Sequence, residues 1–248
     1  MPSNNTKSSK EIHKTRLMYQ DNYNEVENTF NTLLNNLLHS IKIDSENDIK
    51  VNTRLLLFLL GAFAETFLLS FINGLNSKNE PYFENEGIET IISLDTQEKK
   101  WEETIKNAME KKHNKTYHEL SRTDTIIFDD LIKTFELHIT PVIRLRNKMA
   151  HGQFIHIING EEGLHESLYK ENYLTLKSKH KILKQLINCL KSILSSSNTI
   201  TDDYNSFYKK IESILVELKN DKFDTWKIAQ QQTYKHGLIL KEQNAQKN

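Results

Sequence analysis

The chain has 248 residues, a length that suits one large domain or two small ones. Its 33 basic and 33 acidic side chains cancel to a formal net charge of zero, which excludes a global basic field, so a polyanion must bind a local cluster of Lys and Arg. The single cysteine excludes a disulfide framework and a cysteine-rich zinc site, and the scarcity of proline and glycine favours long helices over a turn-rich β fold.

The N-terminal residues are polar and basic and contain no apolar run. They lack the apolar segment of a signal peptide, so we expect residues 1–18 to form a disordered basic arm. From Tyr23 to Ile43 apolar residues recur every three or four positions, which predicts an amphipathic helix. After a polar break, residues 49–75 are apolar nearly all round and are expected to form the central helix of a bundle.

The run 55–75 is long and apolar enough to raise the question of a membrane span. Glu65 lies at its centre, and a carboxylate at the middle of a bilayer costs about 2.5–3.5 kcal/mol on insertion scales. We therefore expect a helix buried in protein and a cytoplasmic chain that does not bind a membrane. The lone Cys189 also fits the cytoplasm, which is a reducing compartment. A membrane-attached effector is the third alternative for function.

Residues 77–122 are expected to form an irregular insertion, because Pro81, Gly87 and several Asn and Glu residues interrupt the helical pattern. Within it, the pattern predicts a short helical turn at 88–92 and a peripheral helix at 98–114. The apolar side of that peripheral helix carries Trp101, Ile105, Ala108 and Met109.

A core helix is predicted from Thr123 onwards. Its expected buried residues are Ile126, Ile127, Leu131, Phe135 and Ile139. Pro141 then predicts either a kink or a restart with Thr140 as the cap and proline at the first helical position. Both alternatives place residues 142–151 on a helix. Gly152 is the expected left-handed terminator, before the segment 154–158 and a loop at 159–163.

The last core helix is predicted at 173–194, and the residues up to 198 are expected to form a linker. A further helix is predicted at 201–220, and a shorter one from Asp224. The expected fold class is therefore all-α, with a helical bundle over residues 19–196 and a C-terminal helical extension over residues 199–240.

The segment R-L-R-N-K-M-A-H-G combines a guanidinium, an amide and an imidazole at the end of one predicted helix. It resembles the signature of the HEPN superfamily, in which an Arg, usually followed by a polar residue, precedes a His by four to six positions. Arg146, Asn147 and His151 match this pattern. The resemblance extends to a preceding core helix with a lone acidic residue, here Glu65, and covers residues 55–75 and 123–194.

The HEPN resemblance implies a helical bundle that acts as an endoribonuclease without a metal or cofactor. RNA supplies its own nucleophile, the 2′-hydroxyl, so cleavage needs a base, an acid and positive charge on the phosphate. Histidine, with an ordinary pKa of about 6.5, suits the first two roles. Arginine suits the third, because its planar fork meets two phosphate oxygens. The expected products are a 2′,3′-cyclic phosphate and a 5′-hydroxyl.

One chain carries one such histidine, whereas the reaction is best served by two proton-transfer groups. The resemblance implies a homodimer in which two motifs share a cleft on the two-fold axis. On an ideal helix Asn147 and His151 lie about 40° apart, but Arg146 and His151 lie about 140° apart. Arg146 and His151 therefore converge only if the helix breaks near its end or the site is shared across an interface.

Further residues are expected to support the site. Glu65 either pairs with Arg146 or is simply a buried carboxylate neutralised by some cation. Arg144 is either a second phosphate contact or the true motif arginine, and we prefer Arg146 because Asn follows it. Several lysines are candidates for RNA binding, although such a run is more often a solvated face: Lys148, Lys177, Lys179, Lys181 and Lys184.

Two classes of function remain open. The first is a homodimeric endoribonuclease of a bacterial antiviral defence system, of the abortive-infection or toxin type, which HEPN resemblance implies and which an antitoxin or other regulatory partner would keep silent. The second is a non-catalytic HEPN-like sensor, antitoxin-type partner or dimerisation scaffold that binds a nucleotide or RNA. In the second case His151 is merely a cation at a helix end and Arg146 a surface ion-pair former. No histidine spacing predicts a metal site.

Overall fold

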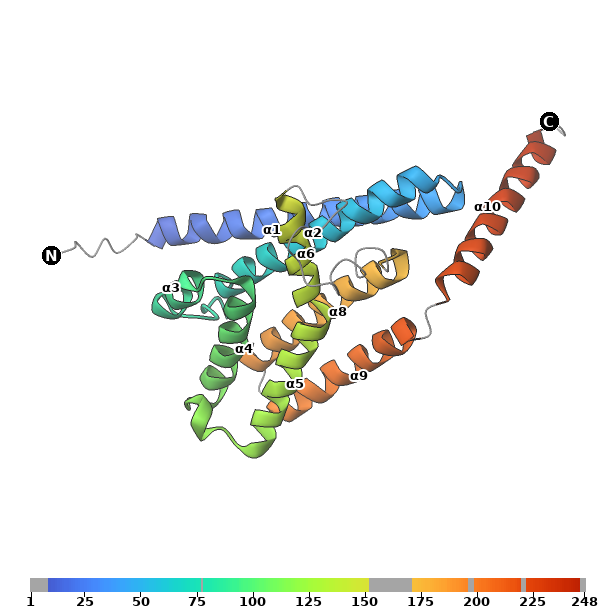
Figure 1. The fold of residues 1–248 in the computed structure, drawn as a ribbon. Coiled ribbons are helices and arrows are strands. Elements are labelled where there is room, and N and C mark those ends of the chain that lie inside the picture. The colour runs from blue at the N-terminus through green and yellow to red at the C-terminus, as the bar shows by residue number, and fades with distance from the viewer. Residues whose placement is uncertain (1–8, 77, 152–170, 196–198, 220–221, 246–248) are drawn as a thin grey trace.

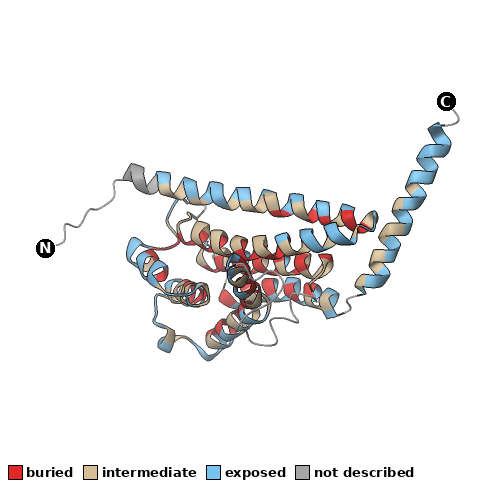
Figure 2. Ribbon diagram, turned by 45° about the horizontal axis from the view of Figure 1, so that its top comes forward, coloured by how far each residue is buried: buried red, intermediate tan, exposed pale blue. Residues whose placement is uncertain are grey.

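The computed structural model describes residues 9–76, 78–151, 171–195, 199–219 and 222–245, with side chains from residue 14 onwards. Across these residues the regular elements are helices, and one isolated bridge joins Leu75 to Pro81. The predicted all-α fold is therefore confirmed. Figure 1 shows the helices gathered into a bundle from which the last one extends, and Figure 2 shows the buried residues concentrated where helices face each other.

Helix α1 (Ser9–Lys42) lies along α2 (Glu46–Ile72), and the two are joined by a short turn in which Asp44 has a positive φ of 58°. Phe30, Leu37 and Ile41 are the fully buried contacts of α1. The disordered arm predicted over residues 1–18 is wrong from Ser9 onwards, because the helix begins there; residues 1–8 lie outside the described part of the chain.

Helix α2 is the central helix of the bundle, as predicted, and it begins and ends three residues earlier than expected. It is long and apolar enough to cross a membrane by length and composition, but 56% of its most apolar window is buried inside the protein. Asn73 ends the helix, and its side-chain nitrogen donates to the carbonyl of Leu69 at 2.8 Å.

The segment predicted as an irregular insertion is mostly helical. It contains α3 (Asn85–Ser93), α4 (Gln97–His113) and the short 3-10 helix η1 (Tyr117–Glu119). The description of α4 as peripheral is wrong: all four of its predicted apolar residues are fully buried. Trp101 stacks on Phe135 of the next helix at 5.2 Å, so α4 is a wall of the core.

Helix α5 (Arg122–His138) begins at the cap residue Ser121, whose hydroxyl accepts from the backbone of Asp124. Its predicted buried set is confirmed except for Ile126, which is 53% exposed. The chain restarts in α6 (Thr140–Ala150) with proline in the first turn, as one of the two alternatives predicted. The cap is Ile139 and not Thr140, because the Ile139 carbonyl accepts the first helical hydrogen bonds.

Helix α8 (Tyr173–Ser195) forms the core helix predicted at 173–194, but it is not the last one, because α9 (Ile200–Lys219) packs against it within the core. Phe207, Ile211 and Ile214 of α9 belong to the same buried cluster as α2, α4 and α5. The domain boundary predicted between residues 196 and 199 therefore does not divide the core. Only α10 (Phe223–Ala245) is an extension, since none of its residues is buried and Figure 2 shows its far end exposed all round.

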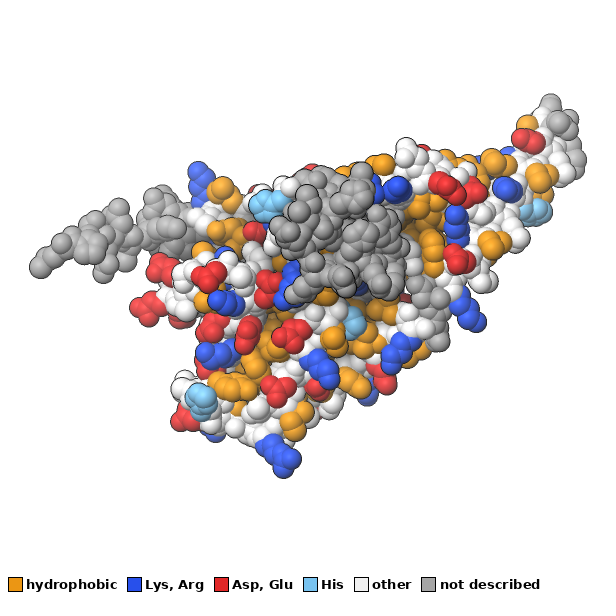
Figure 3. Space-filling view, viewed as in Figure 1, with side chains coloured by type: hydrophobic (Ala, Val, Ile, Leu, Met, Phe, Trp, Pro, Cys, Tyr) orange, Lys and Arg blue, Asp and Glu red, His pale blue; other side chains and the backbone are white. Residues whose placement is uncertain are grey.

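The core has two clusters, and α2, α6 and α8 each contribute buried residues to both. The larger one joins the C-terminal half of α2 to α3, α4, α5, α8 and α9. The smaller one joins α1, the N-terminal half of α2, α6 and the start of α8, and includes Leu145 and Met149 of the motif helix. On the face shown in Figure 3, acidic and basic side chains are interspersed, as the zero net charge predicts.

Candidate active site

Helices α2 and α6 cross at very short range, and a glycine makes this crossing possible. A Cβ atom placed on Gly61 would lie 2.4 Å from Cβ and 2.8 Å from Cγ of Arg146, and 3.3 Å from the carbonyl oxygen of Val142. These distances are too short for any side chain. Gly61 thus lets the stem of Arg146 rest directly on the backbone of α2.

The guanidinium of Arg146 is held from three sides. Its Nη2 donates to Oε2 of Glu65 at 3.0 Å, and its Nη1 donates to Oδ1 of Asn147 at 3.0 Å. Its central carbon lies 5.8 Å from the ring centre of Phe58, within range of a cation–π contact. Of the two alternatives left open for Glu65, the structure shows the pairing with Arg146.

This cluster lies at the surface and is not sealed in the core. The Arg146 and Glu65 side chains are 29% and 35% exposed, and Asn147 is exposed. The Nε of Arg146 is buried and has no hydrogen-bond partner among the described residues. The two Nη atoms each carry a second N–H beyond the bonds to Glu65 and Asn147, so an anion can approach from the exposed side.

Helix α6 ends immediately before His151, which is its C-cap residue with φ −91° and ψ 18°. The backbone N–H of His151 donates to the carbonyls of Asn147 and Lys148, and its imidazole is exposed. The described residues include no hydrogen-bond or ion-pair partner for that ring. The helical register therefore continues up to the backbone N–H of His151, so Arg146 and His151 of one chain stay on different sides of α6. Of the two conditions for their convergence, a site shared across an interface is the one that remains. Gly152 and the segments at 154–158 and 159–163 lie outside the described residues.

Arg144 lies on a different side of α6 from Arg146, because two residues correspond to about 160° of rotation. Its Nε lies 3.3 Å from Oε1 of Glu98 on α4. It borders a separate hollow with Glu102 and Thr140. The structure therefore does not bring Arg144 into the cluster around Arg146. Lys148, also on α6, is half-buried.

The predicted RNA-binding lysines of α8 do not form one free basic face. Lys179 pairs with Glu171, and this pair is mostly buried, while Lys184 pairs with Glu27 of α1. Burial acts to raise the pKa of Glu27, but hydrogen bonds from Lys184 and Tyr23 outweigh it, so that pKa is lowered. Lys181 is only loosely paired, 3.8 Å from Glu217. Lys177 lies over the Tyr173 ring.

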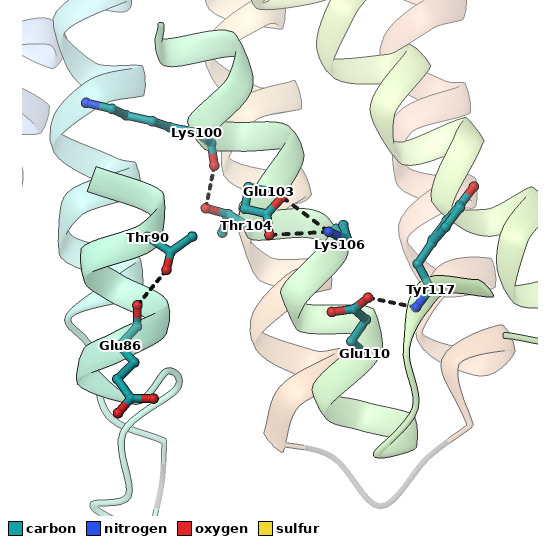
Figure 4. A network of polar contacts seen from close by, with 8 residues as sticks. All are labelled: Glu86, Thr90, Lys100, Glu103, Thr104, Lys106, Glu110 and Tyr117. Carbon is teal, nitrogen blue, oxygen red and sulfur yellow. Dashed lines mark hydrogen bonds and ion pairs between the residues drawn. The ribbon is translucent and has the colours of Figure 1, made fainter. Parts of the chain in front are cut away.

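Several other polar groups, on α3, α4 and α8, have structural roles. Burial lowers the pKa of His180 to about 4, and its ring stacks on Phe30, so it is a core residue. Figure 4 shows the polar contacts of α3 and α4, which are local: the Thr90 and Thr104 hydroxyls donate to carbonyls one turn earlier. The Tyr117 backbone donates to Glu110 at 2.7 Å and fastens η1 to α4. No group of three metal-ligating side chains occurs within the described residues.

Phe58 and Gly61 are the two members of the site that sequence reasoning missed. Both lie on the face of α2 that carries Glu65, Phe58 seven residues and Gly61 four residues before it, so helical spacing alone places them on one side. A glycine inside a long apolar helix was the available signal, because such a residue marks a close approach of another backbone or side chain.

No family model, curated protein or solved structure matches the chain. Function must therefore be inferred from the side chains. The group that stands out is a fixed, partly exposed guanidinium with an amide beside it and an exposed imidazole at the end of the same helix.

Proposed function

We propose that this protein is a metal-independent endoribonuclease that cleaves RNA through attack of the 2′-hydroxyl. Arg146 binds the scissile phosphate, Asn147 orients the guanidinium, and His151 transfers protons. The observation that carries the proposal is the fixed position of Arg146, which Glu65, Asn147 and Phe58 hold at the surface of the α2–α6 crossing. Pre-orientation of a cation suits catalysis, because no reorganisation is needed as charge develops on the phosphate.

The reaction requires only groups that this chain and RNA provide. A base removes the 2′-hydroxyl proton, the oxygen attacks phosphorus, and the bond to the 5′-oxygen breaks. An acid returns a proton to the leaving oxygen, which gives a 2′,3′-cyclic phosphate and a 5′-hydroxyl. Arg146 balances the negative charge of the phosphorane, and the exposed His151 ring is accessible to substrate.

A homodimer would supply the second histidine. Asn147 and His151 are exposed on the end of α6, so the same surface is free to face a second copy of the chain. A two-fold axis through this surface would bring two motifs to one cleft and provide one base and one acid. Lys148, which lies on the motif helix two residues after Arg146, is the described lysine that we expect to contact the RNA backbone.

The HEPN resemblance supports a cytoplasmic role in bacterial antiviral defence, with activity released when an infection or a partner protein signals it. An enzyme that degrades cellular RNA must be held inactive in the healthy cell. We therefore propose that an antitoxin or another regulatory partner binds the surface around Arg146, Asn147 and His151.

The test is incubation of the purified protein and its His151→Ala variant with total RNA in excess EDTA, followed by analysis of fragment ends. We expect cleavage by the wild type alone, with cyclic phosphates at the new 3′ ends. Because the His151 ring is exposed, the variant should fold like the wild type, and circular dichroism checks this. Cleavage that requires a divalent metal, or that survives in His151→Ala, would refute the mechanism.

The second candidate function is a non-catalytic module that binds RNA or nucleotide. It is favoured by the ion pair between Arg146 and Glu65, which already partly neutralises the guanidinium in the free protein. In that case RNA binds with the same dependence on Arg146 but stays intact. Gel-shift and cleavage assays on one RNA preparation separate the two candidates.

A further inference from the structure

A second candidate site lies at the other end of the smaller core cluster, where α8, α9 and α10 meet. A cavity of about 440 Å³ opens there. Its apolar wall is formed by Leu174, Val216, Leu218 and Trp226, and its polar wall includes Lys177, Lys181 and Lys222. The volume lies in the range of small-molecule sites, which are mostly apolar with a few convergent polar groups.

The base of α10 forms a fixed side of this cavity. Trp226 stacks on Tyr173 of α8, with ring centres 5.0 Å apart and an angle of 11° between the planes. Farther along, Lys227 pairs with Asp44 at 3.2 Å, and Gln231 donates to the same carboxylate. The Lys227 contact lowers the pKa of Asp44, which keeps this link ionised.

The charge of the cavity wall is positive. Three lysines line it against one carboxylate, Glu217, which lies 3.8 Å from Lys181. Lys177 lies over the Tyr173 ring, 5.6 Å from its centre, and neither it nor Lys222 has an ion-pair partner among the described residues. In Figure 3, hydrophobic side chains are open to view beside the base of α10, with basic side chains near them.

We propose that this cavity binds a small amphiphilic anion, with its apolar body against Leu174, Val216 and Trp226. The phosphate or carboxylate head lies among the three lysines. A nucleoside monophosphate and a medium-chain fatty acid share this chemistry. The site is separate from Arg146, so it stands or falls independently of RNA cleavage.

Tryptophan fluorescence provides the readout. The chain has two tryptophans, and Trp101 is fully buried against Phe135, so a ligand in the cavity acts on Trp226. The full-length protein is titrated separately with adenosine 5′-monophosphate and with laurate. Equilibrium dialysis measures the stoichiometry, for which we expect one molecule per chain.

The variant Lys177→Gln/Lys222→Gln should weaken binding by about tenfold or more, as expected for the loss of charge-assisted contacts. Val216→Trp should abolish it by filling the cavity, and Val216 is exposed enough to accept the larger ring. Lys209→Gln, on an exposed part of α9 outside the cavity, is the matched control and should bind like the wild type.

The pattern of binding decides the outcome. Binding of the nucleotide alone or of laurate alone identifies the source of the anion, and binding of both supports the shared chemistry. Binding of neither at millimolar concentration overturns the proposal. Binding that is unchanged in Lys177→Gln/Lys222→Gln and in Val216→Trp overturns it as well.

Discussion

The α2–α6 crossing and the α8–α10 junction both present cations at the surface, but they hold them differently. At the crossing, the stem of Arg146 rests on Gly61, and its guanidinium is fixed by Glu65, Asn147 and Phe58. At the junction, three lysines line a cavity: Lys181 is loosely paired with Glu217, and the other two have no ion-pair partner among the described residues. A fixed planar cation suits the orientation of a reacting phosphate, whereas long mobile ammonium groups suit attraction of an anion.

The largest effect on the RNA cleavage rate is expected when the planar guanidinium at position 146 is replaced by another cation. Arg146→Lys keeps the charge but removes the planar fork that reaches Glu65 and Asn147 together. We expect the RNA cleavage rate to fall by roughly 10²–10³-fold, the range for loss of a preorganised charge-stabilising group.

The matched control is Arg144→Lys, because Arg144 is also on α6 and also pairs with a glutamate. Its cleavage rate should stay within a few-fold of the wild type. A larger loss in Arg144→Lys than in Arg146→Lys would make Arg144 the motif arginine.

The next effect is on stability at low pH and concerns His180, a buried residue of α8. Burial lowers its pKa in the folded state to about 4, below the ordinary value of 6.5. The unfolded chain therefore binds the proton first, so stability is complete above about pH 6.5 and falls as the pH drops towards 4. The loss is on the order of 3 kcal/mol.

Urea unfolding of the wild type and His180→Phe between pH 4 and 7 measures this effect. The phenylalanine variant should lose less stability over that range, because no proton binds at this position. Equal slopes of stability against pH would show that other groups cause the acid sensitivity.

Gly61→Ala tests the close approach at the crossing. The added Cβ must displace Arg146 or α2, and overpacking costs roughly 1–3 kcal/mol. Alanine recovers up to about 1 kcal/mol of helix propensity, so the net loss in the free energy of unfolding should be smaller. Cleavage should fall with the displacement of the guanidinium.

Gly237→Ala in α10 is the control for Gly61→Ala, because a Cβ there meets nothing within 4 Å. This variant should be slightly more stable than the wild type. Thermal melts of the two variants give the comparison, and a stabilised Gly61→Ala would show that the helices are not tightly packed at this point.

The smallest stability effect is expected from Glu65→Gln. The pair with Arg146 is about one third exposed, so its loss should change the free energy of unfolding by less than about 1 kcal/mol. Glu98→Gln, which releases Arg144 in the same way, is the matched control. Only Glu65→Gln should alter the cleavage rate, and equal activity of the two variants would remove Glu65 from the site.

Helical periodicity predicted most of the fold, because buried residues in a bundle repeat every three or four positions. The ends of α2 differ from the prediction by three residues and those of α9 by one, as capping depends on local hydrogen bonds. The burial of α4 was missed because its many charged residues occupy the opposite face and mask four fully buried side chains.

The site was only partly predictable for a related reason. The R-N-K-M-A-H-G segment predicts Arg146, Asn147 and His151 as site residues. Helical spacing along α2 places Phe58, Gly61 and Glu65 on one face. Which lysines are neutralised depends on partners far away in sequence, such as Glu27 for Lys184 and Glu217 for Lys181. No local pattern contains that information.

The central claim is that this protein cleaves RNA through the 2′-hydroxyl beside Arg146. Its most direct test compares the cleavage rate, in excess EDTA, of an RNA that contains a mapped cleavage position with the same RNA carrying 2′-O-methyl at that position. We predict cleavage of the first, with a cyclic phosphate at the new end, and none of the second at that position. Equal cleavage of both RNAs would contradict the proposed mechanism.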